Sequence, residues 1–148
     1  MNNKIPPPIV ALICGLSIYF SKLAFPTIQG GWSGPTALVL LILGIGVLVA
    51  AVLSFKKQDT TVNPLQPEKA SSLVITGLFK YSRNPMYLGM LLLLLSLTAK
   101  FNVIGGLLIT LCFLLFMTKF QIIPEECALE SKFGEKFTQY KGQTRRWL

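Results

Sequence analysis

The segment 77–89 reads GLFKYSRNPMYLG and stands directly before the apolar run 90–97, which reads MLLLLLSL. The pair Asn84-Pro85 predicts the start of a helix, because Asn is a favoured N-cap and Pro is favoured at the first helical position, where no N–H is needed. The N–H groups of that helix would point back toward the polar side chains before it, and such a site suits an anion. A capped membrane helix with flanking positive charges would have the same pattern.

The composition indicates an integral membrane protein with a single domain over residues 1–148. Hydrophobic residues make up 52% of the chain and charged residues 14%, against about 25% charged in a typical soluble domain. The net charge of +8 lies at the ends of apolar runs, which favours an anionic membrane surface over nucleic acid as the counter-charge. The chain has no histidine, so an imidazole base is excluded. The three cysteines lack the spacing of a metal site, and we expect neither a metal nor a disulfide.

Four apolar segments predict an all-α fold with four transmembrane helices, at about 9–26, 36–55, 85–99 and 103–120. The third is only about 22 Å long at 1.5 Å per residue. A short turn at 100–102 makes the last two segments a helical hairpin. Gly44 and Gly46 in the second segment predict close helix packing, within one chain or between two, so the oligomeric state stays open.

Polar segments follow the second and the fourth apolar runs. Residues 56–84 predict a structured loop, because their prolines and polar residues disfavour one long helix while their apolar residues argue against disorder. Pro124 ends or kinks the fourth span, and 125–140 predicts an amphipathic helix with apolar residues at helical spacing. The end of the chain, 145–148 (RRWL), is typical of an interfacial anchor.

The distribution of positive charge predicts a multi-pass protein of the inner or plasma membrane with both termini in the cytoplasm. Most Lys and Arg residues fall in the segment between spans two and three and in the C-terminal segment, whereas the opposite loops hold only Lys22 and Lys100. The six acidic residues fall on the same side as the positive charges. Any chemistry is therefore expected at the cytoplasmic face.

The hairpin brings the loop that ends at Tyr87 close to Glu125 and Glu126. Two adjacent carboxylates just below an apolar span are costly unless they are paired, although acids in a first helical turn also favour the helix dipole. Both a functional carboxylate pair and a structural role fit this position.

Two motifs carry a resemblance to a known family. SLVITGLFKYSRNPMYLG at 72–89 and EExxLxxxFGxxFxxY at 125–140 resemble the isoprenylcysteine carboxyl methyltransferase and phospholipid methyltransferase superfamily from about Asp59 onward. The resemblance implies transfer of a methyl group from S-adenosylmethionine to a lipophilic or membrane-embedded acceptor at the cytoplasmic face, with S-adenosylhomocysteine as product. It implies the lipid bilayer and the acceptor as partners.

The resemblance also implies the site residues, carried over by position. The adenosyl side would be lined by Gln66, Ser71, Ser72, Leu73, Val74 and Phe79. The methionine portion would be held by Asn84, Pro85, Met86 and Tyr87, with Glu125 and Glu126 closing the pocket. The residues assigned to catalysis are Tyr87 and Glu125, which also belong to this cofactor set, and Arg83. The carboxylate of the cofactor suits Arg83 and the helix start at Pro85, and methyl transfer needs alignment more than acid–base groups.

The sequence departs from the family pattern at two points. The family usually has Arg-His-Pro where this chain has Arg83-Asn84-Pro85, and Asn cannot carry an imidazolium charge. Members that methylate isoprenylcysteine tend to carry Arg just before the acidic pair, where this chain reads KFQIIP at 119–124. A phospholipid amine or another small lipophilic acceptor therefore stays open, and so does a non-catalytic scaffold. A transporter is disfavoured, because no span has a central acid.

Overall fold

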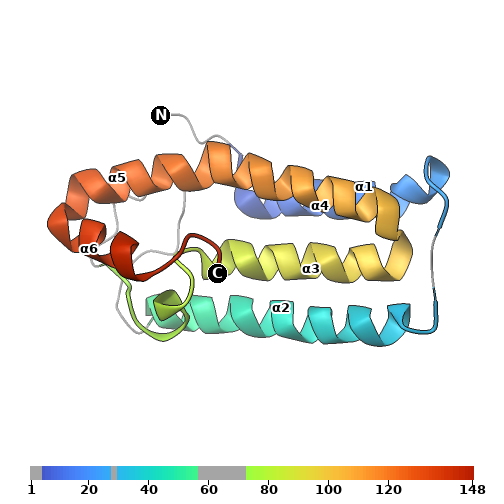
Figure 1. Cartoon of the computed structure of the whole chain (residues 1–148), viewed down its shortest axis with the longest axis horizontal. Coiled ribbons are helices and arrows are strands. Elements are labelled where there is room, and N and C mark those ends of the chain that lie inside the picture. Colours follow the sequence, from blue (N-terminus) through green and yellow to red (C-terminus); the bar gives the residue numbers. More distant parts are fainter. Residues whose placement is uncertain (1–4, 28–29, 57–72) are drawn as a thin grey trace.

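The computed structural model describes residues 5–27, 30–56 and 73–148, and within these ranges every regular element is helical. This confirms the all-α class. The long helices are α1 (Pro7–Phe20), α2 (Ser33–Lys56), α3 (Pro85–Phe101) and α4 (Val103–Met117), followed by the shorter α5 (Ile123–Phe133) and α6 (Glu135–Gln143) (Figure 1). The short turns are the 3₁₀ helices η1 (Ser21–Leu23) and η3 (Gly77–Lys80) and the π-helical turn η4 (Thr118–Ile122).

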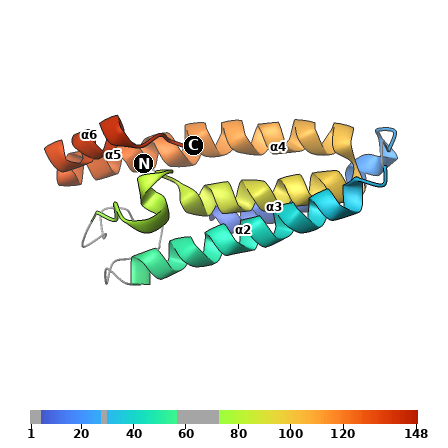
Figure 2. The ribbon, with the colours of Figure 1, turned by 60° about the horizontal axis from the view of Figure 1, so that its bottom comes forward.

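Helix α3 is the central helix of the bundle, because it packs against α1, α2 and α4 (Figures 1 and 2). Apolar side chains from α1, α3 and α4 and from η4 meet in one core. Its buried members are Ile18, Tyr87, Met90, Leu94, Phe113, Met117 and Ile122. The first turn of α3, which carries Tyr87, is thus fixed by the same core that holds the bundle together.

The hairpin of α3 and α4 turns at Asn102, which is fully buried. Its Oδ1 accepts a hydrogen bond from the Gly105 N–H at 2.9 Å and caps α4, and its Nδ2 donates to the Phe25 carbonyl at 3.1 Å. One amide therefore satisfies groups of two segments that would otherwise be left without partners. The Thr98 and Thr110 hydroxyls, 3.2 Å apart, join the two helices further along.

The outer faces of the bundle are apolar. Many large hydrophobic side chains of α1, α2 and α4 are 40% or more exposed, among them Leu12, Ile42 and Leu115. Such a surface is typical of contact with lipid. Two helical runs, Ser33–Lys56 and Val103–Phe133, are long and apolar enough to cross a membrane, while Pro7–Leu23 and Pro85–Phe101 are shorter apolar helices.

The C-terminal part differs from the single amphipathic helix that the sequence predicts over 125–140. The helical run continues from α4 through η4 into α5 and breaks at Gly134, whose φ is +54°. Glycine adopts this backbone conformation without the steric cost of a Cβ. The π turn lies just before Pro124, which has no N–H to donate to the preceding turn. Pro124 therefore neither ends nor interrupts the run, and α6 folds back as a separate helix.

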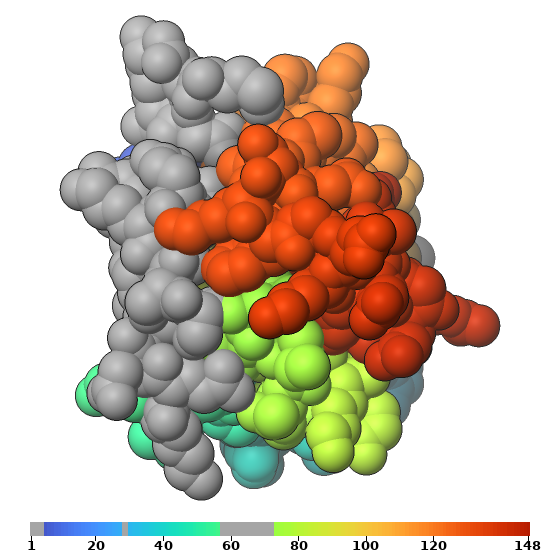
Figure 3. All heavy atoms as spheres, turned by 90° about the vertical axis from the view of Figure 1, so that its left-hand side faces the viewer, coloured from blue at the N-terminus to red at the C-terminus, as the bar shows by residue number. Residues whose placement is uncertain are grey.

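A second apolar cluster lies at the end of the bundle where α3 begins. Val74 and Phe79 pack there against Phe137 and Tyr140 of α6, and the Tyr140 hydroxyl donates to the Phe79 carbonyl at 2.6 Å. Figure 3 views this end, with α5 and α6 (orange to red) against the segment 73–84 (yellow-green). Of the structured loop predicted over 56–84, Val74 and Phe79 are buried and Ile75 is exposed, while 57–72 lie outside the described residues.

The glycines of α2 differ in their surroundings. A Cβ on Gly44 would lie 3.1 Å from the Gly89 carbonyl oxygen of α3, whereas a Cβ on Gly46 would meet nothing within 4 Å. Gly44 therefore permits the close approach of α2 and α3. The prediction of close packing is confirmed at Gly44 but not at Gly46.

We expect Gly89→Ala to lower the free energy of unfolding by about 1–3 kcal/mol, as overpacking does. The added Cβ would lie 2.6 Å from Leu48 Cγ and 3.1 Å from the Gly44 carbonyl oxygen, so α2 and α3 would have to separate. Thermal unfolding in detergent measures the change, and Gly46→Ala is the control. Equal effects of the two substitutions would contradict the assigned packing.

Candidate functional site

The two sequence motifs meet at the beginning of α3. The Tyr87 hydroxyl, on the first turn of α3, donates to Glu125 Oε2 at 2.9 Å. Tyr87 is buried, and the buried Gln121 of η4 also hydrogen-bonds its side chain. Within the run 103–133 the apolar part ends near Phe120, and both Glu125 and Glu126 come after it. The predicted proximity of the loop and the acidic pair is confirmed.

Glu126 lies between two arginines from different parts of the chain. Arg83 Nη2 is 2.8 Å from Glu126 Oε1, and Arg146 donates to both carboxylate oxygens, from Nε at 3.1 Å and from Nη2 at 2.7 Å. Burial alone would raise the pKa of Glu126, but the hydrogen bonds and charges of Arg146 and Arg83 outweigh it and lower the pKa. The same contact raises the pKa of Arg146. Glu126 is therefore ionised at neutral pH.

Arg83 also holds the C-terminal residues through backbone groups. Its N–H donates to the Arg145 carbonyl at 3.0 Å, and its Nη1 donates to the carbonyls of Lys141, at 3.1 Å, and Thr144. Arg83 Nε is buried without a hydrogen-bond partner among the residues that the structure describes. The chain end is further fixed by Trp147, which packs on the main core and donates to Thr118 Oγ1 at 3.2 Å. Arg146 and Trp147 thus contact the bundle while Arg145 and Leu148 are exposed, and the interfacial anchor at 145–148 stays a prediction.

Asn84 occupies the N-cap position of α3, but its side chain makes no capping hydrogen bond. Its Nδ2 donates instead to the Arg146 carbonyl at 2.9 Å. The prediction of a side-chain cap is therefore wrong, while the predicted helix start at Pro85 is confirmed. The Asn84 side chain therefore leaves the N–H groups of the first turn unoccupied by it, and a helix N-terminus of this kind suits an anion.

Glu125 differs from its neighbour in charge behaviour. Burial raises its pKa from 4.5 to about 7, the hydrogen bond from Tyr87 opposes this shift, and the charge of Glu126 adds to it. Near neutral pH, Glu125 is thus divided between its acid and its carboxylate forms. A carboxyl group of this kind can give or take a proton at the pH of the cell.

The residues assigned to the cofactor fall into two groups in the structure. Leu73, Val74 and Phe79 belong to the second apolar cluster. The other group surrounds the first turn of α3 and contains Arg83, Asn84, Pro85, Met86, Tyr87, Glu125 and Glu126. The positions Gln66, Ser71 and Ser72 lie outside the described residues. Within the described ranges no cluster of His, Cys, Asp and Glu could hold a metal.

Sequence reasoning missed two residues of this site, Gln121 and Arg146. Arg146 is separated from its partner Glu126 by 20 positions, and no local pattern marks such a pair. Gln121 is buried and lies in the π turn, and no pattern in the sequence predicts this turn. A buried amide in an apolar segment next to Pro124 is the one signal that could have singled it out.

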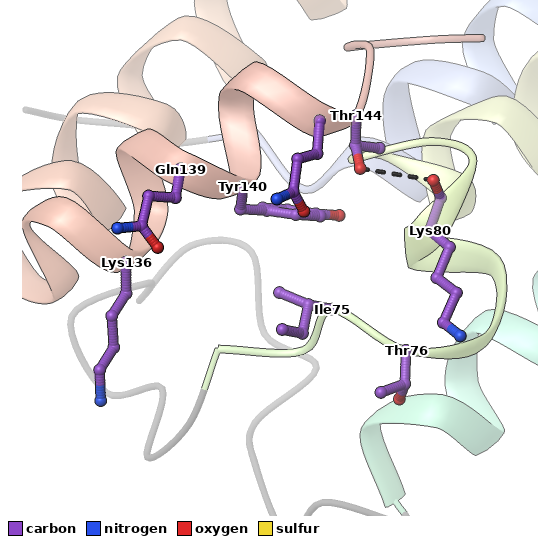
Figure 4. Close-up of a pocket in the computed structure, with 8 residues that line it drawn as sticks. Ile75, Thr76, Lys80, Lys136, Gln139, Tyr140 and Thr144 are labelled. Carbon is purple, nitrogen blue, oxygen red and sulfur yellow. Dashed lines mark hydrogen bonds between the residues drawn. The ribbon is translucent and has the colours of Figure 1, made fainter.

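A hollow of about 460 Å³ opens beside the second apolar cluster, between α6 and the segment 75–80 (Figure 4). Among the described residues it is lined by Ile75, Thr76, Lys80, Lys136, Gln139, Tyr140, Gln143 and Thr144. None of these is among the residues assigned to the cofactor. The Thr144 hydroxyl donates to the Lys80 carbonyl at 3.4 Å and joins the two walls.

We expect Glu126→Gln to lower the free energy of unfolding by about 3–5 kcal/mol, because the largely buried Arg83 and the partly exposed Arg146 would lose their counter-charge. The Glu126 side chain is only 10% exposed. Glu130→Gln is the matched control, since Glu130 is 43% exposed in its pair with Lys141 and such pairs contribute about 0–1 kcal/mol. Denaturant titration in detergent measures both. Similar losses would show that Glu126 does not hold the site together.

The raised pKa of Glu125 predicts a pH-dependent stability. The unfolded carboxyl ionises at 4.5 while the folded one stays protonated up to about 7, so the folded state binds more protons in this window. Stability should therefore fall as pH rises from 4.5 to about 7 and level off above it. Thermal unfolding across this range tests it. Glu125→Gln should flatten the profile and the exposed Glu135→Gln should not; an unchanged slope in Glu125→Gln would refute the assignment.

Comparison with known proteins identifies the family. The model of the phospholipid methyltransferase family matches residues 33–136, which include α2 to α5 and both Tyr87 and Glu125. An uncharacterised protein of Haemophilus influenzae is 44% identical over 63 residues, which are 43% of this chain and all of that protein. No solved structure matches. Since the family match covers more than half of the chain and agrees with the resemblance of its two motifs, this chain belongs to the phospholipid methyltransferase family.

Proposed function

We propose that this protein is a membrane methyltransferase that uses S-adenosylmethionine to methylate a lipid-type acceptor. The observation that carries the proposal is the hydrogen bond of 2.9 Å between Tyr87 and Glu125. It joins the two motifs of the family at the start of α3, within the segment that the family model matches. When bound, the cofactor supplies an electrophilic methyl group on a sulfonium.

The groups around the first turn of α3 fit such a cofactor. The N–H groups of this turn have no side-chain cap, and the buried Arg83 Nε has no partner within the described part of the chain. Both are donors suited to a carboxylate. The Glu125 side chain, in its carboxylate form, suits an ammonium or a sulfonium. Asn84, Pro85, Met86 and Tyr87 would hold the methionine portion, and Leu73, Val74 and Phe79 would line the adenosyl side.

The ion cluster of Glu126 has a positioning role in this proposal. Arg146 and Arg83 keep Glu126 ionised and hydrogen-bonded, so Glu126 orients the backbone before Pro85. Glu125 is then the carboxyl group of the pair that gains or loses a proton. Because Arg83 also binds the C-terminal backbone, the residues after α6 close one side of the site and exclude water from it.

A phospholipid amine is the acceptor that Glu125 favours. An ammonium group must lose a proton before its nitrogen can accept a methyl group, and a carboxyl with a pKa of about 7 can take that proton at neutral pH. A carboxylate acceptor of the isoprenylcysteine type is already ionised and needs no base. The description of the family as phospholipid methyltransferases agrees with the first acceptor.

We further propose that α1, α2, α3 and α4 all span the inner or plasma membrane, with both termini in the cytoplasm. The exposed apolar faces of these helices support the proposal. Lys56, Lys80 and Arg83 lie at one end of the bundle, and Lys22 and Lys100 at the other, so positive charge is greater at the end that carries the site. The site would then open at the cytoplasmic headgroup level, where a lipid acceptor can reach it from the bilayer.

Calorimetric titration of the purified protein with S-adenosylhomocysteine tests the proposal. We expect saturable binding that Glu125→Ala and Tyr87→Ala weaken by about tenfold or more, because each removes the part-buried hydrogen bond between Tyr87 and Glu125. Lys132→Ala, an exposed position on α5, is the control and should bind like the parent. Thermal unfolding checks that each variant is folded.

Two results would contradict the proposal. A folded parent protein that binds no S-adenosylhomocysteine would favour a non-catalytic scaffold of the same fold. Binding that both pocket variants retain would place the cofactor elsewhere. If the parent binds, labelled methyl donor with phosphatidylethanolamine or with a farnesylated cysteine then separates the amine acceptor from the carboxylate acceptor.

A further inference from the structure

The hollow between α6 and the segment 75–80 carries positive charge on two sides. Lys136 belongs to α6, and Lys80 belongs to η3 on the opposite wall (Figure 4). Both side chains are exposed. Neither forms an ion pair with any residue in the described ranges, and the lining named above contains no acid. The hollow is therefore a cationic site open to solvent.

Among the described residues, the nearby carboxylates do not neutralise this charge. Glu126 is held by Arg83 and Arg146, and Glu130 pairs with Lys141. Glu135, at the start of α6, does not line the hollow. The Tyr140 hydroxyl is engaged with the Phe79 carbonyl. Gln139 and Gln143 line the α6 wall of the hollow and bring uncharged amide donors to it.

The cofactor is a poor match for this hollow. S-adenosylmethionine carries a sulfonium and an ammonium against one carboxylate, so its net positive charge is repelled by two lysines. A phosphate ester is negatively charged, accepts several hydrogen bonds, and is commonly bound by lysine as a point charge. The volume of about 460 Å³ falls in the range of small-molecule sites, about 300–1,000 Å³.

We propose that this hollow is a second binding site, specific for a phosphate ester and separate from the site at the start of α3. Lys80 and Lys136 would pair with the phosphate from two walls of the hollow, and Gln139 and Gln143 would donate hydrogen bonds to its remaining oxygens. A phospholipid headgroup and a soluble phosphate ester share this chemistry. The site does not depend on methyl transfer, because no residue of the Tyr87–Glu125 pair lines it.

Titration of the full-length protein in a neutral detergent tests the proposal with two probes, glycerol phosphate and a short-chain phosphatidylglycerol. Lys80→Gln and Lys136→Gln each remove one charge from an exposed position and should weaken binding about tenfold, as expected for the loss of one charged contact. The matched control is Lys132→Gln, an exposed lysine outside the hollow. It should leave binding unchanged, and none of the three variants should alter binding of S-adenosylhomocysteine.

Each outcome decides between clear alternatives. Binding of both probes assigns the site to the phosphate itself, and binding of the lipid alone assigns it to a membrane headgroup. Absence of binding in the folded parent, or binding that Lys80→Gln and Lys136→Gln retain, overturns the proposal. Loss of S-adenosylhomocysteine binding in these variants also overturns it, because the hollow would then belong to the cofactor. A parent that binds a phosphate probe but no S-adenosylhomocysteine would leave this site standing and refute the methyltransferase proposal.

Discussion

The carboxylate of Glu126 is the contact on which the site depends. It lies between Arg83, just before α3, and Arg146, in the last residues of the chain, at 2.8 Å and 2.7 Å. Removing two such charges from water is costly, and the cost is recovered only if their geometry and remaining hydrogen bonds are satisfied. Arg83 meets this condition at its N–H and its Nη1, through the backbone carbonyls of the C-terminal segment, whereas its Nε has no partner among the described residues. One ion cluster thus joins the loop, the hairpin and the chain end into a single unit.

Local patterns in the sequence were sufficient to predict the four long helices and their order. The apolar runs, the Asn-Pro pair before α3 and the turn at 100–102 specify the hairpin, because each depends only on neighbouring residues. The meeting of Tyr87 and Glu125 followed from that hairpin, since both lie at the same end of adjacent antiparallel helices. The remaining site positions came from the family resemblance, and the structure adds the hydrogen-bond partners and the packing of those that it describes.

The features that sequence reasoning missed depend on distant partners. Asn84 has a better acceptor in the Arg146 carbonyl than in its own helix, and no local rule predicts that competition. The π turn at 118–122 turns Gln121 toward Tyr87, which a regular helix would not do at the same position. Gly134 breaks the predicted amphipathic helix because α6 must fold back to cover Val74 and Phe79.

The C-terminal segment is held through its backbone as well as through the side chains of Arg146 and Trp147. Four of its carbonyls, those of Lys141, Thr144, Arg145 and Arg146, accept hydrogen bonds from Arg83 and Asn84, and any residue type offers the same carbonyl. The exposed Arg145 side chain can therefore change at little cost, whereas Thr144, Arg146 and Trp147 also bind through their side chains. Adding or removing one residue between α6 and Trp147 would displace the acceptors that follow the change, while Lys141 within α6 would stay in place. The number of residues between α6 and Trp147 is therefore constrained more tightly than the identity of an exposed residue such as Arg145.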